Sequence, residues 1–265
     1  MNRPEAPLIP DVQSHPDARE LPIDRVGIRG LRYPIRFDDG GDAPQATIAS
    51  CSVYVALPAD RKGTHMSRLV AAIDELREPL SVALLPDLLD ALLGRLEAAA
   101  GRIDIAFPWF VRKSAPVTGA QSMMDYDVQL VADIAPGKRS VELTIVVPVM
   151  SLCPSSKAIA DYGAHNQRSH LTLMVRPRAG AQIPLAELIA LAEAEASCEL
   201  YGLLKRADEK FVTERAYDRP RFVEDLVRGI AARLVDDARL HGFRVAAENF
   251  ESIHNHSAYA EIVRG

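Results

Sequence analysis

The sequence predicts an α+β protein in which one pattern of strands and helices occurs twice. Segments of alternating apolar and polar residues, rich in β-branched and aromatic side chains, are typical of strands that bury one face. Segments with apolar residues three and four positions apart are typical of helices that bury one stripe. In each half of the chain, two strands, two helices and two strands follow one another. We therefore expect two ββααββ units in tandem, each an antiparallel sheet with helices on one face.

The first unit is expected within residues 21–137, after a flexible segment over residues 1–20 that carries four prolines. Its strands are expected at 26–37, 46–57, 103–112 and 125–134, and its helices at 65–76 and 84–100. Gly101 is expected to stop the second helix, because glycine readily adopts the left-handed conformation that follows many helices. A turn at Pro136-Gly137-Lys138 then ends the unit.

The second unit is expected within residues 138–265, although its sequence does not match that of the first. Its strands are expected at 140–151, 170–176, 243–251 and 257–263, and its helices at 185–204 and 220–240. Asp218 is expected to cap the last helix, with Pro220 in its first turn. Two separate four-stranded sheets would leave edges to pair or cover, which favours a homo-oligomer.

Composition and charge narrow the class of function. The 265 residues are 48% hydrophobic and 25% charged, as in ordinary globular proteins. A net charge of −5 offers no basic field to nucleic acid or an acidic membrane. No apolar run is long enough to cross a bilayer, and the N-terminus lacks the apolar core of a signal peptide. Three cysteines make a poor disulfide framework, so we expect a cytoplasmic protein in which any special cysteine is a metal ligand or a nucleophile.

The densest polar cluster is residues 152–170, LCPSSKAIADYGAHNQRSH, between two predicted strands. Cys153 and His165 have eleven residues between them, and a loop of this length can bring a thiolate and an imidazole onto one zinc ion. The alternative is a buried cysteine and an unrelated surface histidine. Lys157 and Arg168, with nearby amides and hydroxyls, would suit a phosphate or a polar heterocycle, or they belong to a solvated loop.

Two later clusters admit both a functional and a structural interpretation. Residues 203–214 contain carboxylates that could complete a metal site and cations that could meet phosphate, or they form an exposed helix end. Glu224 lies beside the apolar stripe of the last helix. It is either favoured there by the helix dipole or a ligand anchor at the rim of the sheet.

A last cluster, residues 251–256, precedes the final strand. His254 and His256 are two residues apart on an extended segment, so they could face one side. They would serve as a proton relay or as metal ligands, unless they are turn histidines.

Together these clusters resemble the type IB GTP cyclohydrolases, prokaryotic enzymes of the tunnelling-fold superfamily. The resemblance covers nearly the whole chain after about residue 22. Its segments are VGIRGL at 26–31, YGAHNQRS at 162–169, KRADEK at 205–210, FVED at 222–225 and HNH at 254–256. The family often has Cys-Pro-Cys-Ser where this chain has Cys-Pro-Ser-Ser at 153–156, so Ser155 would have to replace the second cysteine if that cysteine takes part in catalysis.

The resemblance implies a bimodular tunnelling fold and a homotetramer with active sites at subunit interfaces. It implies conversion of GTP and water to 7,8-dihydroneopterin 3'-triphosphate and formate, the first step of pterin and folate biosynthesis. It also implies a divalent metal held by Cys153, His165 and Glu209, with zinc as the first choice and manganese or iron as alternatives. Glu199 and Glu214 are alternative third ligands.

The same resemblance assigns the remaining site residues. Glu224 would accept hydrogen bonds from the guanine N1–H and 2-amino groups, and His254 or His256 would move protons. Candidates for the triphosphate are Lys157, Arg168, Lys205 and Arg206. The rival interpretations are a tunnelling-fold nitrile reductase, with a cysteine nucleophile and NADPH, and a non-catalytic purine- or pterin-binding protein, of which Ser155 would be the first sign.

Overall fold

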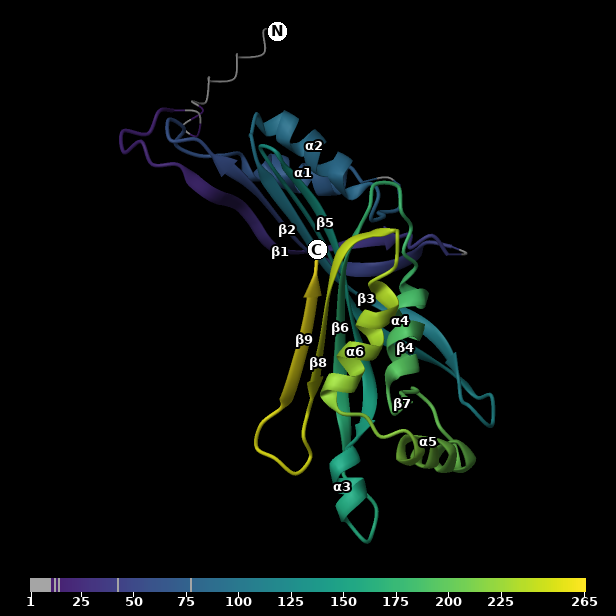
Figure 1. Cartoon of the computed structure of the whole chain (residues 1–265). Coiled ribbons are helices and arrows are strands. Elements are labelled where there is room, and N and C mark those ends of the chain that lie inside the picture. Colours follow the sequence, from purple (N-terminus) through teal and green to yellow (C-terminus); the bar gives the residue numbers. More distant parts are fainter. Residues whose placement is uncertain (1–10, 12, 14, 42, 77) are drawn as a thin grey trace.

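A single antiparallel β-sheet forms the body of the molecule. A computed structural model describes residues 11, 13, 15–41, 43–76 and 78–265. The strands are β1 (Ile23–Phe37), β2 (Gln45–Leu57), β3 (Gly101–Ser114), β4 (Gln121–Ala135), β5 (Lys138–Leu152), β6 (Asn166–Pro177), β7 (Cys198–Glu199), β8 (Leu240–Asn249) and β9 (Ala258–Arg264). Their spatial order is β1-β2-β3-β4-β5-β6-β8-β9, and the short β7 pairs with β5 (Figure 1).

The two separate four-stranded sheets that the sequence predicted are one sheet. β4 and β5 pair from Asp127↔Val146 to Ala135↔Lys138, across the predicted turn. Gly137 has φ 73°, a left-handed conformation that glycine adopts without a steric penalty. The pairing satisfies backbone groups that two separate sheets would each leave at an edge.

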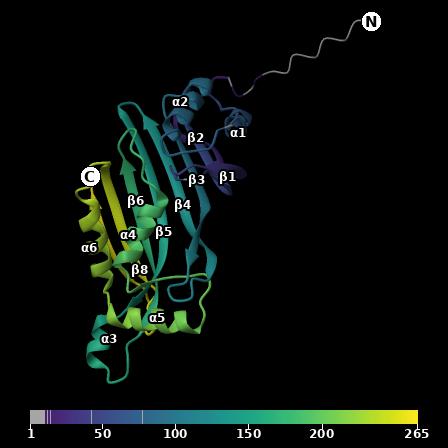
Figure 2. The ribbon, with the colours of Figure 1, turned by 90° about the vertical axis from the view of Figure 1, so that its right-hand side faces the viewer.

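Helices cover one face and one end of this sheet. They are α1 (Met66–Asp74), α2 (Leu85–Leu96), α3 (Pro154–Ile159), α4 (Leu185–Glu195), α5 (Arg206–Asp218) and α6 (Val223–Leu234). The pair α1 and α2 packs on the early strands, α4 packs on β5, and α6 packs on β8 and β9 (Figures 1 and 2). α3 and α5 lie together at one end of the sheet, below α4 and α6 in Figure 1.

An aliphatic core lies between the sheet and the helices. The covered face of β5 presents Leu143, Ile145, Val147 and Val149, all fully buried. The predicted stripe of the last helix is confirmed, because Val223, Leu226, Val227, Ile230 and Leu234 are buried. Each such side chain contributes about 1.5–3 kcal/mol on burial, so the face that a residue occupies is strongly specified.

The observed helices are shorter than the predicted ones, and the last, expected over 220–240, ends at Leu234. The second helix ends at Leu96 and not at Gly101, because Glu97 already adopts a left-handed φ of 51°. The helix expected over 185–204 ends at Glu195, and Cys198 then pairs with Met150 of β5.

The prediction that Asp218 caps the last helix is wrong. The charge run before it forms a complete helix, α5, and Asp218 is the last residue of that helix. α6 begins at Val223 instead. The Phe222 backbone N–H donates to the Asp225 side chain at 2.9 Å, and this bond closes its first turn.

The N-terminal segment is described only in part. The flexible segment expected over residues 1–20 falls largely on residues 1–10, 12 and 14, which lie outside the described residues. Backbone hydrogen bonds join Gln13, His15 and Asp17 to the 60–63 loop. None of the helices in the described part of the chain is long and apolar enough to cross a membrane.

Asp208 ties α5 to the β3–β4 hairpin. Its carboxylate is fully buried and accepts hydrogen bonds from the Val117 and Thr118 N–H groups, each at 2.9 Å, and from the Thr118 hydroxyl at 2.6 Å. The Lys205 N–H donates to it at 2.9 Å. Burial opposes ionisation of Asp208, but these hydrogen bonds outweigh burial and lower its pKa below the usual 3.8. The start of α5 is therefore held by one ionised side chain.

We predict that Asp208→Asn lowers the unfolding midpoint by several degrees at pH 7, because an amide cannot accept at both of its ends. A depressed folded-state pKa gives stability that is present above the unfolded-state value and is lost as pH falls through the folded-state value. The difference in midpoint between wild type and Asp208→Asn should be constant from pH 7 to pH 5 and should shrink below about pH 4. Thermal melts from pH 7 to pH 3 measure it. The control is Asp236→Asn, at an exposed aspartate without a partner in the described residues. A midpoint difference that grows on acidification would contradict the anchoring role.

Candidate functional site

Cys153 and His165 meet where β5 ends and β6 begins. The β5–β6 ladder runs to Leu152↔Asn166, and just beyond it the Cys153 N–H donates to the His165 carbonyl at 3.1 Å. Side chains alternate along a strand, and Ser151 and Gln167 face the covered side. Cys153 and His165 stand two residues beyond them, so the alternation directs both toward that side. The loop therefore folds back, as its length suggested.

Ser156 joins the two ends of this loop. Cys153 occupies the N-cap position of α3, and the Ser156 N–H points to its Sγ at 3.4 Å. The Ser156 hydroxyl donates to the Cys153 carbonyl and accepts from the His165 N–H, each at 3.2 Å. An N–H aimed at sulfur can bond a thiolate as well as a thiol. The predicted Ser155, in contrast, is exposed, and no described contact joins it to Cys153.

Glu251, just after the end of β8, places a carboxylate near His165. Glu251 lies two residues beyond the buried Asn249 of β8, and its Oε2 is 3.7 Å from the His165 Nδ1. Both side chains are only 12% exposed. Sequence reasoning noted the Glu251–His256 cluster but gave Glu251 no role. The alternation of buried residues along β8, which ends at Asn249, could have indicated that Glu251 faces the same side.

The third metal ligand expected from α5 is not beside this pair. Among the described residues, no three His, Cys, Asp or Glu side chains are close enough to hold a metal ion. Glu209 is exposed in the first turn of α5, and Glu214 pairs with Lys210 at 3.2 Å. Glu209 as a ligand therefore stays a prediction.

Glu199, the other alternative ligand, is already engaged. It accepts from the Tyr201 hydroxyl at 2.5 Å and pairs with Arg215 at 3.2 Å. Burial disfavours its charge, but the Tyr201 and Arg215 contacts outweigh burial and lower its pKa. Glu199 is thus an ionised structural group beneath α5.

Glu224 lies at the start of α6, near the end of β5. The Arg221 N–H donates to the Leu152 carbonyl at 3.0 Å, and its guanidinium donates to the Glu195 carbonyl at 3.0 Å. These bonds fix the beginning of α6 beside the residue that precedes Cys153. Glu224 is exposed, and its carboxylate has no hydrogen-bond or ion-pair partner among the described residues. It is therefore free to accept hydrogen bonds from a ligand.

The two histidines of the β8–β9 loop lie together. The rings of His254 and His256 are stacked, with centroids 5.2 Å apart and planes 15° apart. Both are exposed. This loop follows Glu251, so it belongs to the same end of the sheet.

The predicted triphosphate contacts occupy separate surfaces of the single chain. Lys157 donates to the Tyr217 carbonyl, and its ammonium lies 4.1 Å from the Tyr217 ring centroid. Arg168 alternates with the buried Gln167 and is exposed, which places it on the uncovered face of the sheet. Lys205 and Arg206 are exposed at the start of α5.

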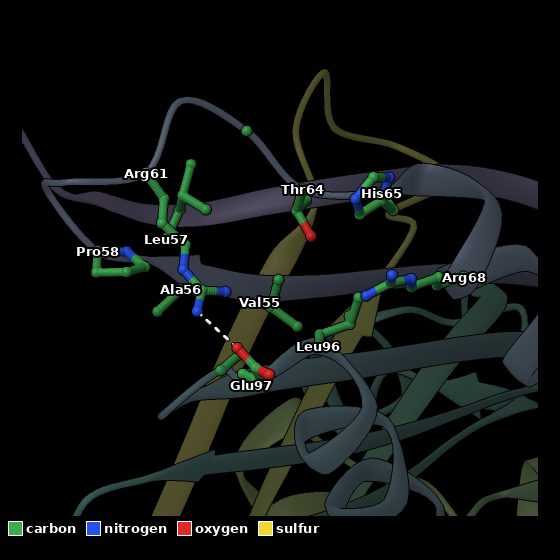
Figure 3. A pocket seen from close by; sticks show the side chains of 12 residues that line it. Val55, Ala56, Leu57, Pro58, Arg61, Thr64, His65, Arg68, Leu96 and Glu97 are labelled. Carbon is green, nitrogen blue, oxygen red and sulfur yellow. Dashed lines mark hydrogen bonds and ion pairs between the residues drawn. The ribbon is translucent and has the colours of Figure 1, made fainter. Parts of the chain in front are cut away.

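A well-formed hollow lies at the opposite end of the sheet. This cavity of about 360 Å³ lies between the end of β2 and the end of α2 (Figure 3). Arg61 and Glu97 face one another across it at 2.7 Å, and His65 bonds Asp11 at 3.2 Å. Arg61, Glu97 and His65 are thus already paired, and the cysteine and histidines of the sequence motifs lie at the other end.

Comparison with known proteins agrees with the motifs. A family model described as type I GTP cyclohydrolase folE2 matches residues 9–260. GTP cyclohydrolase FolE2 of Ralstonia nicotianae is 55% identical over 257 residues, which cover 97% of this chain and 95% of the relative. The proteins of the same name from Cupriavidus necator and Paraburkholderia xenovorans are each 54% identical, with the same shares covered.

Among solved structures, the urate oxidase of Bacillus sp. TB-90 is similar in fold alone. The TM-score is 0.52 at 7% identity, and the match covers 91% of this chain and 100% of that chain. The family model and the curated relatives, in contrast, match nearly the whole sequence. The chain therefore belongs to the type I GTP cyclohydrolase FolE2 family.

Proposed function

We propose that this protein is a metal-dependent GTP cyclohydrolase of type IB. It converts GTP and water to 7,8-dihydroneopterin 3'-triphosphate and formate, at the entry to pterin and folate biosynthesis. The structural observation that carries the proposal is the backbone hydrogen bond that places Cys153 beside His165, a residue of the family's YGAHNQRS segment, at the end of the covered face. Family membership over 97% of the chain supports it.

The proposal includes a tandem tunnelling fold and a homotetramer. Its two units are residues 21–137 and 138–265, joined in one sheet, and each active site lies between subunits. Exposed apolar side chains around the site support such an interface: Tyr162 is 98% exposed, Ile159 81% and Ile253 64%. At a subunit interface, the exposed Glu209 of one chain would lie beside the Cys153–His165 pair of another chain.

Cys153, His165 and Glu209 would hold the metal, with zinc as the first choice and manganese or iron as alternatives. The donor set fits, because a half-buried thiol and a nearly buried imidazole are suited to zinc. A bound divalent ion would lower the pKa of water towards about 7, which makes hydroxide available at neutral pH for attack on guanine C8.

The chain's own groups would bind the nucleotide and move protons. The unpartnered Glu224 carboxylate would accept from the guanine N1–H and 2-amino groups, a charge-assisted pair of bonds. His254 or His256 would protonate N7, which makes C8 more electrophilic. Lys157, Arg168, Lys205 and Arg206 would contact the triphosphate, from more than one subunit.

We predict that Cys153→Ala loses both metal and activity. Removing a ligand should weaken zinc binding by more than about a hundredfold, since even outer-shell partners cost 10–100-fold. The measurements are metal content and formate released from GTP, with and without a chelator. Cys51→Ala is the matched control, because burial raises the pKa of the Cys51 thiol to about 11 and keeps it neutral. Full turnover with metal retained in Cys153→Ala would refute the metal site. NADPH oxidation with a nitrile, or GTP binding without neopterin formation, would refute the activity.

We predict that Glu224→Gln lowers kcat/KM for GTP by about ten- to a hundredfold, because a hydrogen bond to a charged group contributes about 1.5–3 kcal/mol. The preference for GTP over inosine triphosphate, which lacks the 2-amino group, should shrink as well. Steady-state kinetics with both nucleotides measure this, and Glu78→Gln, at an exposed glutamate between α1 and α2, is the control. An unchanged preference would exclude Glu224 as the guanine anchor.

We predict that His254→Gln or His256→Gln lowers kcat by about 10²–10⁴-fold, the usual contribution of a positioned acid–base group. Metal content should stay at the wild-type level, which separates this effect from that of Cys153→Ala. His241→Gln, at the opposite end of the sheet, serves as control. If both variants retain wild-type kcat, neither histidine transfers the essential proton.

A further inference from the structure

A row of polar side chains lies buried directly behind His165. Ser151, Gln167, Ser169 and Asn249 end the covered faces of β5, β6 and β8, and they are 0–7% exposed. Elsewhere this face is aliphatic, with Val149 and Leu171 as the next residues inward. Burying polar groups costs free energy unless they are hydrogen-bonded. The hydrogen bonds of these four side chains therefore decide how much free energy their burial costs.

The bonds form a chain that leads to the imidazole. The Gln167 Nε2 donates to the Ser151 Oγ at 2.8 Å, and the Ser151 and Ser169 hydroxyls share a hydrogen bond at 2.7 Å. The other end of the amide, Oε1, lies 2.9 Å from the His165 Nδ1. Asn249 is the cross-strand partner of Ser169 and closes the row.

The contacts of the His165 Nδ1 favour one histidine tautomer. Because the Gln167 NH₂ group is directed at Ser151, only its carbonyl oxygen faces His165, and a carbonyl can only accept. The Glu251 Oε2 at 3.7 Å is a second acceptor on the same nitrogen. With two acceptors on this side, the neutral ring is expected to carry its proton on Nδ1, which leaves the lone pair on Nε2.

We propose that Gln167, held by Ser151 and Ser169, is a positioning residue that presents the His165 Nε2 as the metal-binding nitrogen. The inference rests on the proposed function, since it concerns the same metal site. Gln167 fixes the ring's tautomer and its orientation about the side chain, so the imidazole is ready before the ion arrives. Partners of this kind typically change metal affinity by 10–100-fold.

The test compares zinc affinity in full-length variants, by competition with a chromophoric chelator. Gln167→Met keeps the length of the side chain but removes the acceptor, and we expect zinc to bind about 10–100-fold more weakly. Gln167→Glu keeps an oxygen at Nδ1, and the Ser151 hydroxyl can rotate to donate to it, so affinity should stay within about threefold of wild type. Ser169→Ala removes the far end of the chain and should give a smaller loss.

The matched control is Gln45→Met. Gln45 is a strand glutamine that bonds the Phe110 N–H and carbonyl, each at 2.9 Å, far along the chain from the site. It should lose hydrogen bonds without losing zinc affinity. Wild-type affinity in Gln167→Met, equal loss in Gln45→Met, or equal loss in Gln167→Glu and Gln167→Met would each overturn the proposal.

Kinetics at saturating zinc provide a second readout. If Gln167 orients the ring, Gln167→Met should lower kcat while KM for GTP stays near the wild-type value, and Gln167→Glu should restore kcat. Wild-type protein that binds zinc but releases no formate would defeat the proposed function and leave the positioning role intact. If the wild type is active but Gln167→Met binds zinc as tightly as the wild type, the proposed function stands and the positioning role is refuted.

Discussion

The register of β5 against β6 is the constraint on which the candidate site depends. The ladder pairs Leu143 with Val175 at one end and Leu152 with Asn166 at the other, so Cys153 and His165 emerge opposite one another. A slip of one residue would turn every side chain of one strand to the other face. The aliphatic residues of both strands are fully buried on the covered side, so such a slip would expose the core. Burial of the core therefore also fixes the position of the thiol and the imidazole.

The same alternation explains why the site is polar only at its end. On the covered face of β5, β6 and β8, apolar residues are followed towards this end of the sheet by a buried serine, glutamine or asparagine, and then by Cys153, His165 or Glu251. The polar row is satisfied internally, except that the Asn249 Oδ1 has no partner among the described residues. Such a network rigidifies the groups that it contacts more than an apolar core would. The scaffold thus changes gradually from hydrophobic core to reactive surface.

A single chain supplies only part of the proposed chemistry. Glu209, Arg168, Lys205 and Arg206 are exposed to solvent, and Lys157 is bonded to Tyr217, while exposed apolar side chains surround the Cys153–His165 loop. α5 is nevertheless firmly placed, because the buried Asp208 carboxylate ties its first turn to the β3–β4 hairpin. A rigid helix that presents unpaired charged groups is suited to completing a site across an interface. A site shared between two subunits would bring Glu209 to the Cys153–His165 pair, although these residues lie apart within one chain.

The sequence by itself predicted every strand except β7 and four of the six helices, because alternation and helical periodicity are local, and the YGAHNQRS segment drew attention to Cys153 and His165. It missed the joining of β4 to β5, and it missed Glu251, which lies almost 90 residues from His165. It also misplaced the end of α2 and the start of α6, because the left-handed Glu97 and the Phe222–Asp225 hydrogen bond set these two boundaries. Only the tertiary structure showed that Gln167 contacts the His165 imidazole. Which side chain reaches which atom depends on strand register, and register is decided by burial over whole strands and not by any short segment.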